Sequence, residues 1–302
     1  MPFSLAETET YLKSKGCDLD RYQILQLYMV LGGIPQYLNA VKKGDSTSQS
    51  IDKICFKKNG LLNEEFDNIY NSLFEMADNH IKAVRALAIA QKGLTRRDII
   101  ENCGLSSGGR TTTMLDELEQ SGFIKSSKIY DKETKDSIYR IIDEFSLFYL
   151  KFMDKADQGT HWARISEGAS YKIWSGMAFE STCLKHISQI KSGLGISDKL
   201  TMESGWRYVP PKASKENGAQ VDLLIDRDDH CINICEIKFY AGEFSINKAY
   251  AAELQQKIDV FREKTRTKKT LFLTLISTYG VKDNSHAAAL VKKNLTMDVL
   301  FD

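Results

Sequence analysis

The sequence predicts a protein of the α/β class, in which a helical amino-terminal half precedes a domain that mixes strands and helices. Three observations lead to this prediction. Apolar residues recur at helical spacing through most of the region before residue 122, short apolar segments with strand character recur after residue 200, and a helical segment, 247–264, separates those strands.

Composition and charge restrict the class of protein further. Of the 302 residues, 42% are hydrophobic and 27% are charged, which is typical of globular domains, and the length allows two of them. The formal net charge of +1 provides no overall attraction to nucleic acid, so any such binding must depend on local patches. No apolar run is long enough for a membrane helix, and the amino terminus lacks the features of a signal peptide. We therefore expect a cytoplasmic protein without a membrane partner.

The first segment, 1–60, is predicted to be helical. Apolar residues follow helical spacing in YQILQLYMVLGGIPQYL, and Gly32-Gly33 followed by Pro35 is the pattern that ends one helix and begins the next. This segment is short, so its apolar face needs a partner surface.

The second segment, 61–150, is predicted to contain three helices and a β-hairpin. A long helical pattern covers 64–91, a second helix begins after Thr95 and ends at Gly104, and a third follows from Ser107 to Gly122. Two alternating segments, 123–130 and 137–143, then flank a polar turn.

This order of elements is typical of a winged helix-turn-helix. The third helix would be the recognition helix, and its first turns contain Arg110, Thr111 and Thr112, which could contact phosphates or bases of DNA. Winged helices also bind proteins, so both kinds of partner remain open.

After an aromatic-rich helix and an irregular linker, 151–175, the last domain is predicted to cover 176–302. Its helices are expected at 176–190, 247–264 and 285–293, and its strands at 201–209, 219–227, 231–239, 269–277 and 295–301. The core of this domain therefore has the order αβββαβ.

Two of these strands contain charged residues among apolar ones. Asp222 lies in AQVDLLIDR, and Glu236 and Lys238 lie two positions apart in CINICEIKF, so that both point to the same face. Such charges are costly in a core unless they are paired or bound to a metal. Two carboxylates are suitable ligands for Mg²⁺ (or Mn²⁺), and a neighbouring lysine can orient the attacking water.

The segments NGAQVDLLID and ICEIK resemble the second and third motifs of the PD-(D/E)xK nuclease superfamily, and GMAFE resembles its helical first motif. The resemblance implies a metal-dependent nuclease of DNA or RNA, with Asp222 and Glu236 as metal ligands and with Lys238 and Glu180 completing the site. One departure is that many members have a Gln and a Tyr on the following helix, whereas Gln255 and Gln256 lack a matching Tyr. A non-catalytic DNA- or protein-binding regulatory module that keeps this fold as a scaffold is the alternative.

The wider chain resembles the carboxy-terminal region of prokaryotic AAA-family ATPases, with GGIPQYL similar to the end of the ATPase lid. The resemblance implies that an ATPase partner or a P-loop domain is missing here, and that the chain is a fragment, a truncation or one part of a split system. The segment GLSSGGRT, 104–111, is only superficially similar to a P-loop, because a helix and not a strand is predicted before it. We therefore expect no ATP site in this chain.

Overall fold

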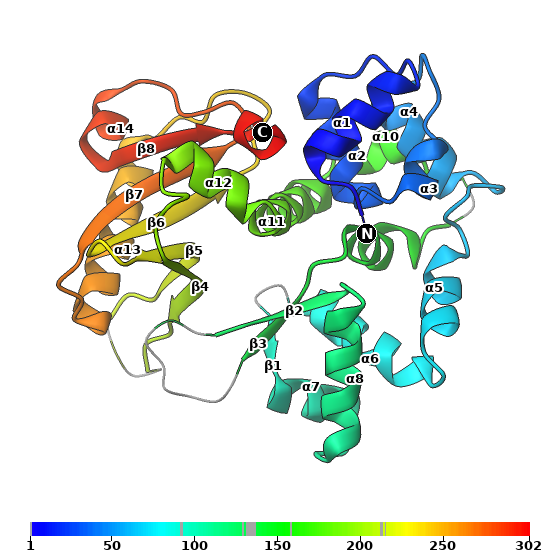
Figure 1. Ribbon diagram of the computed structural model, residues 1–302, viewed down its shortest axis with the longest axis horizontal. Coiled ribbons are helices and arrows are strands. Elements are labelled where there is room, and N and C mark those ends of the chain that lie inside the picture. Colours follow the sequence, from blue (N-terminus) through cyan, green and yellow to red (C-terminus); the bar gives the residue numbers. More distant parts are fainter. Residues whose placement is uncertain are drawn as a thin grey trace. The chain divides into compact units, whose positions relative to one another are not determined.

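The computed structural model describes residues 2–90, 93–128, 130, 137–157, 159–211, 214 and 216–302. The chain divides into two units (Figure 1). The first consists of Met1–Ser126, Asp136–Lys185 and Phe301, and the second of Ser127–Lys135, His186–Leu300 and Asp302. The predicted α/β class is confirmed, because helices accompany a mixed five-stranded sheet.

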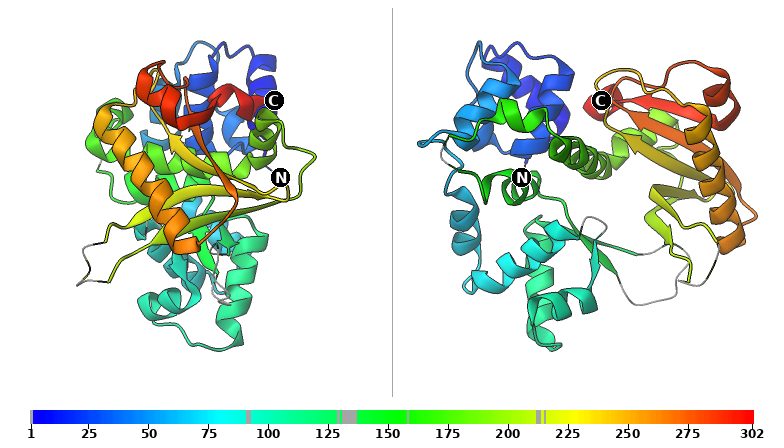
Figure 2. Two further views of the ribbon diagram at one scale, coloured as in Figure 1. Left: turned by 90° about the vertical axis from the view of Figure 1, so that its left-hand side faces the viewer. Right: turned by 180° about the vertical axis from the view of Figure 1, so that it is seen from behind.

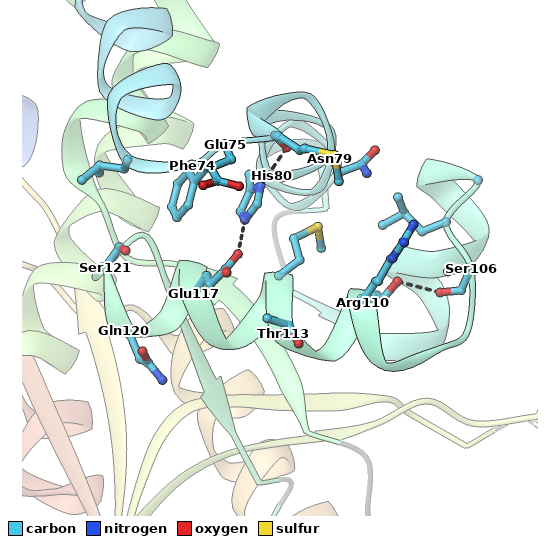
Figure 3. A pocket seen from close by; sticks show the side chains of 16 residues that line it. Phe74, Glu75, Asn79, His80, Ser106, Arg110, Thr113, Glu117, Gln120 and Ser121 are labelled. Atoms are coloured by element: carbon cyan, nitrogen blue, oxygen red, sulfur yellow. Dashed lines mark hydrogen bonds and ion pairs between the residues drawn. The ribbon is translucent and has the colours of Figure 1, made fainter.

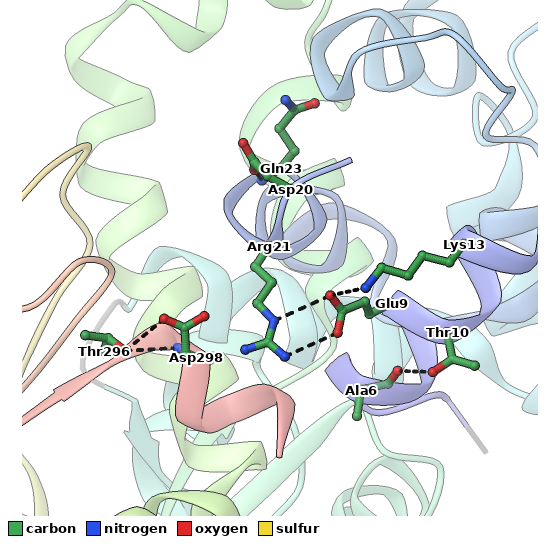
Figure 4. A network of polar contacts seen from close by, with 9 residues as sticks. All are labelled: Ala6, Glu9, Thr10, Lys13, Asp20, Arg21, Gln23, Thr296 and Asp298. Carbon is green, nitrogen blue, oxygen red and sulfur yellow. Dashed lines mark hydrogen bonds and ion pairs between the residues drawn. The ribbon is translucent and has the colours of Figure 1, made fainter. Parts of the chain in front are cut away.

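The first unit begins with three helices, α1 (Leu5–Ser14), α2 (Arg21–Leu31) and α3 (Pro35–Asn39). As predicted, α2 ends at a glycine in the left-handed conformation, Gly32, and α3 begins at Pro35. Glu9 of α1 accepts hydrogen bonds from Lys13 and Arg21 and thereby joins α1 to α2 (Figure 4).

The following helices are α4 (Thr47–Ile51), the π-helix η1 (Asp52–Phe56), α5 (Glu65–Leu73) and α6 (Ala77–Ile89). The prediction of one helix over 64–91 was wrong, because the chain leaves the helical conformation after α5. Phe74 is extended, and its buried ring stacks on the imidazole of His80 with the ring centroids 4.0 Å apart. The apolar positions on both sides of this break keep helical spacing, so the sequence pattern does not reveal it.

The next elements are α7 (Arg96–Cys103) and α8 (Gly109–Gln120), which stand beside a three-stranded sheet. Thr95 caps α7 as predicted and forms a reciprocal capping box with Asp98, and Gly104 ends the helix in the left-handed conformation. The helix predicted before the P-loop-like segment is therefore present.

The three-stranded sheet has the order β1-β3-β2, with β1 at Leu94–Thr95, β2 at Ile124–Ser127 and β3 at Ile138–Ile141. The sequence did not indicate β1, which has only two residues. The predicted turn of the hairpin, 131–136, lies outside the described residues.

The first unit closes with α9 (Glu144–Phe148), the π-helix η2 (Tyr149–Met153), α10 (Trp162–Ser166) and α11 (Ala169–Lys185). The region predicted as a linker, 151–175, thus contains α10 and the first turns of α11. Its aromatic side chains pack together: Trp162 and Trp174 both make edge contacts with Phe148 and Phe152.

The second unit contains α12 (Ile187–Leu194) and a sheet of five strands in sequence order. These are β4 (Thr201–Tyr208), β5 (Ala219–Arg227), β6 (Cys231–Lys238), β7 (Thr270–Ser277) and β8 (Val291–Thr296). The strand β5 is antiparallel to both of its neighbours, β4 and β6, whereas β7 is parallel to both β6 and β8. The predictions for β4, β5, β6 and β7 are confirmed almost to the residue.

The predicted last strand, 295–301, was wrong in its position. The strand β8 follows directly after α14 (Ser285–Leu290), and the chain then turns into the 3₁₀-helix η3 (Met297–Phe301). The cause is local, because the Thr296 side chain accepts a hydrogen bond from the backbone N–H of Asp298 and caps the turn.

The long helix α13 (Lys248–Thr265) crosses one face of this sheet (Figure 2). It contributes Ala251, Leu254 and Phe261 to the core. From the sheet this core receives Trp206, Val221, Leu224, Ile232, Ile234, Leu273 and Leu275. The other side of β5 and β6 is also buried, so both strands are mostly apolar, with a few polar and charged positions.

Candidate active site

The predicted residues Asp222, Glu236 and Lys238 lie on the adjacent strands β5 and β6. The strands form here because their β-branched and leucine side chains are buried on both faces. The antiparallel register pairs Leu223 with Cys235. Because the two strands run in opposite directions, Asp222, one residue before Leu223, and Glu236, one residue after Cys235, lie on the same side of this pair. The sheet therefore brings the two carboxylate positions to neighbouring places.

The pairing of β5 with its other neighbour, β4, is irregular at Asp222. Ser204 pairs with Leu224 and Trp206 pairs with Val221, so two residues of β5, Asp222 and Leu223, stand opposite one residue of β4. This is the arrangement of a β-bulge, which re-aims the side chains at its position and is over-represented beside active sites.

Glu236 is buried and holds the centre of a polar cluster. Its Oε1 accepts a hydrogen bond from the Tyr250 hydroxyl at 2.7 Å. The same oxygen forms an ion pair with Lys238 Nζ at 2.8 Å. Its Oε2 pairs with Lys257 Nζ. We call Glu236, Lys238, Tyr250 and Lys257 the Glu236 cluster.

The electrostatics of the cluster favour the charged form of this carboxylate. Burial by itself would raise the pKa of Glu236, but the ammonium groups of Lys257 and Lys238 outweigh burial and hold the pKa below its usual range. Burial and the neighbouring Glu236 raise the pKa of the Tyr250 hydroxyl, so that this group stays a hydrogen-bond donor.

Asp222 is half-buried beside the cluster. Its negative charge adds to the effects that raise the pKa values of the Tyr250 hydroxyl and the Cys235 thiol, for both of which burial is the main cause. The carboxylates of Asp222 and Glu236 thus act on the same hydroxyl. Together with two lysines, they form a site with balanced formal charge.

Two members of the Glu236 cluster, Tyr250 and Lys257, were missed by the sequence analysis. Both belong to α13, one turn before and one turn after Leu254, which is fully buried against the sheet. Their spacing of seven residues places them on the same face of that helix. Tyr250 reaches the carboxylate from that helix, but it precedes Gln255 and Gln256, so the departure from the superfamily pattern stays as predicted.

The other predicted site residues lie in the first unit. Glu180 is half-buried on α11, and Arg110, Thr111 and Thr112 lie in the first turn of α8. Thr111 is buried, and its hydroxyl donates to the carbonyl of Ser106, so its position is explained by packing.

Arg110 lines a pocket beside α8 that also contains His80 and Glu117, which are hydrogen-bonded at 2.8 Å (Figure 3). Thr112 is exposed and lies beside Arg96, whose guanidinium donates to the carbonyls of Ser107 and Gly108. Three residues were predicted to contact nucleic acid. Arg110 and Thr112 remain candidates for this contact because their side chains are exposed.

Within the described part of the chain, no group of three or more His, Cys, Asp or Glu side chains is arranged to hold a metal ion. Among the same residues, no helix is both long and apolar enough to span a bilayer.

No family model matches the sequence, and searches among curated proteins and solved structures found no match.

Proposed function

We propose that the second unit is a metal-dependent phosphodiesterase of the PD-(D/E)xK nuclease type that acts on nucleic acid. The observation that carries the proposal is the placement of Asp222, Glu236 and Lys238 on the adjacent strands β5 and β6 of a mixed sheet. The bulge at Asp222 and the order of α12, β4, β5, β6, α13 and β7 support it.

The donor set fits a hard divalent cation. Mg²⁺ needs only one or two protein carboxylates and keeps several waters, and Asp222 and Glu236 supply oxygen donors of this kind. When bound, such a cation lowers the pKa of a coordinated water and offsets negative charge on the phosphate. The positive charges of Lys238 and Lys257 already balance the negative charges of Asp222 and Glu236. A bound cation and a bound phosphodiester have charges of opposite sign, so each would partly offset the charge that the other brings to the site.

The protein side chains have separate tasks in this proposal. Lys238 is 32% exposed and reaches solvent from the Glu236 cluster, so it contacts the phosphate and orients the attacking water. Lys257 and Tyr250 contact Glu236 and position its carboxylate. Glu180, which the resemblance assigns to this site, belongs to the first unit, so the proposal gives it no role beside the cluster.

In the first unit, the order of α6, α7, α8, β2 and β3 supports a winged helix-turn-helix. Arg110 and Thr112, at the beginning of α8, are the residues proposed to contact DNA phosphates. The likeness to the carboxy-terminal region of AAA-family ATPases adds an ATPase as a proposed partner.

Cleavage of labelled single-stranded DNA, duplex DNA and RNA with Mg²⁺ or Mn²⁺ tests the proposed activity. The wild type should cleave at least one of them, and Glu236→Gln and Lys238→Ala should each lower the rate by about 10²–10³-fold, the usual effect of losing one charge-stabilising group. Lys293→Ala removes an exposed lysine of β8 and is the matched control, with an unchanged rate expected. Absence of cleavage with every metal, or equal rates in the variants, would remove the catalytic claim.

One observation favours the alternative, a non-catalytic DNA- or protein-binding module. Both oxygens of Glu236 already have partners, so the Glu236 cluster satisfies its own charges as a structural ion network does. In a module of this kind, the cluster would contribute stability and no metal would bind at Asp222.

A further inference from the structure

Two tyrosines are exposed at the ends of the central strands of the second unit. Tyr240 follows β6 and is 53% exposed, and Tyr279 follows β7 and is 40% exposed. Because β6 and β7 are parallel, with Lys238 paired with Ser277, both tyrosines leave the sheet at the same edge. Lys238 ends β6 at this edge, so both tyrosines follow the strand ends at the edge of the sheet that carries the candidate active-site lysine.

The loops that carry these rings are tied to each other. The Thr278 hydroxyl accepts the backbone N–H of Tyr240 at 3.0 Å and donates to the carbonyl of the same residue. Further along, the backbone of Phe244 bonds to Gly280 at 2.8 Å and to Lys282 at 3.0 Å. A ligand that stacks on the tyrosines therefore needs little ordering of the chain, which favours affinity.

Aromatic contacts lead from the exposed Tyr240 ring towards the buried carboxylate. Tyr240 makes an edge contact with Phe244, and Phe244 makes one with Tyr250, at centroid distances of 6.0 and 5.4 Å. The Lys238 ammonium lies 5.5 Å from the centroid of the Tyr250 ring, whose hydroxyl bonds to Glu236. A group stacked on Tyr240 would thus lie close to the lysine proposed to bind the phosphate.

We infer that Tyr240 and Tyr279 form a platform on which unpaired nucleobases stack, so that single-stranded nucleic acid is the ligand of this site. Every base offers a face for stacking on an aromatic side chain, whereas the bases of a duplex are already stacked on their neighbours. The link between this platform and cleavage rests on the proposed function, but binding to it does not.

Fluorescence anisotropy of the full chain in EDTA tests the platform without cleavage. The probes are labelled single-stranded DNA, single-stranded RNA and a blunt DNA duplex of about 16 nucleotides per strand, the upper end of known site sizes for single-strand binding folds. At least one single-stranded probe should bind more tightly than the duplex. Tyr240→Ala and Tyr279→Ala should each weaken that binding about 5- to 150-fold, and the corresponding Phe variants should retain it.

Leu200→Ala is the matched control, because it removes exposed apolar surface from the residue before β4 and should leave binding unchanged. The inference is overturned if the duplex binds as tightly as both single strands, or if the two Tyr→Ala variants behave like the control while unfolding at the wild-type temperature. Single-strand binding that depends on the tyrosines, without cleavage by any metal, would remove the nuclease proposal and keep the platform.

Discussion

Glu236 can stay charged in the core of the second unit because two lysines and a tyrosine surround its carboxylate. Lys257 is the more deeply buried of the two lysines, and removing one partner of a buried pair leaves an uncompensated charge. We expect Lys257→Met to lower the free energy of unfolding by about 3 kcal/mol, the lower end of the range for buried pairs, since Lys238 still pairs with the carboxylate.

Urea unfolding measures this change, and Lys264→Met provides a control on the same helix. Lys264 pairs with Glu216 at the surface, so its loss should leave the free energy of unfolding nearly unchanged. Equal effects of the two substitutions would contradict the account of the Glu236 cluster.

The lowered pKa of Glu236 predicts how stability depends on pH. The charged carboxylate contributes its full stabilisation above the unfolded-state pKa of about 4.3, and this contribution is lost as the pH falls through the lower folded-state pKa. Glutamine imitates the neutral carboxyl group. The stability advantage of the wild type over Glu236→Gln should therefore be constant above about pH 5 and shrink below about pH 4.

Unfolding free energies measured from pH 7 down to about pH 3 give this comparison, over the range in which a carboxyl group titrates. If the difference in unfolding free energy between the wild type and Glu236→Gln stays constant or grows in acid, the lysines do not hold the carboxylate in its charged form.

At the scale of single elements, two glycines with positive φ that lie next to helices differ in what they contact. Gly33 and Gly104 both have positive φ, but a Cβ on Gly33 would lie 2.3 Å from the Phe3 carbonyl oxygen, whereas a Cβ on Gly104 would meet open space. Gly104→Ala should cost about 1–2 kcal/mol for the left-handed conformation, and Gly33→Ala a further ~1–3 kcal/mol for the clash.

Thermal unfolding of the two variants side by side tests this difference. Equal losses would show that the segment before α1 moves away from Gly33 at no cost, and that this contact does not fix the beginning of the chain.

The sequence predicted elements well where one local pattern determines them. The strands β5, β6 and β7 follow apolar runs, and Gly32, Pro35, Thr95 and Gly104 stand at helix ends where their backbone or side-chain chemistry is required. The break at Phe74 and the 3₁₀ turn after Thr296 were not predicted, because they depend on a ring stacked against His80 and on a single side-chain cap.

The candidate site was predictable in part, because some of its residues also stand out in a local sequence pattern. Asp222, Glu236 and Lys238 are charged positions inside apolar strands, a contrast that is visible in the sequence. Tyr250 and Lys257 lie on a helix rich in polar residues, where only the face turned to the sheet distinguishes them from solvated side chains. The direction of that face follows from packing, which composition does not specify.

At the scale of the whole molecule, 41 basic residues against 40 acidic ones leave no net field that could attract nucleic acid over a distance. Any recognition of nucleic acid must therefore depend on local chemistry, which we propose is that of the exposed tyrosines at the sheet edge that carries Lys238. This view predicts that function follows a few side chains of the second unit and not the total charge.

Thermal unfolding of the full chain during a Mn²⁺ titration tests the central claim most directly, because a cation that binds the folded site raises stability with concentration. The account predicts saturable stabilisation of the wild type, amounting to about 2.7 kcal/mol at a hundredfold excess over Kd. Asp222→Ala should abolish it, and Asp226→Ala, which removes a carboxylate of the same strand that pairs with Lys269, should retain it. No stabilisation of the wild type, or equal stabilisation in Asp222→Ala, would contradict a metal site at Asp222 and Glu236.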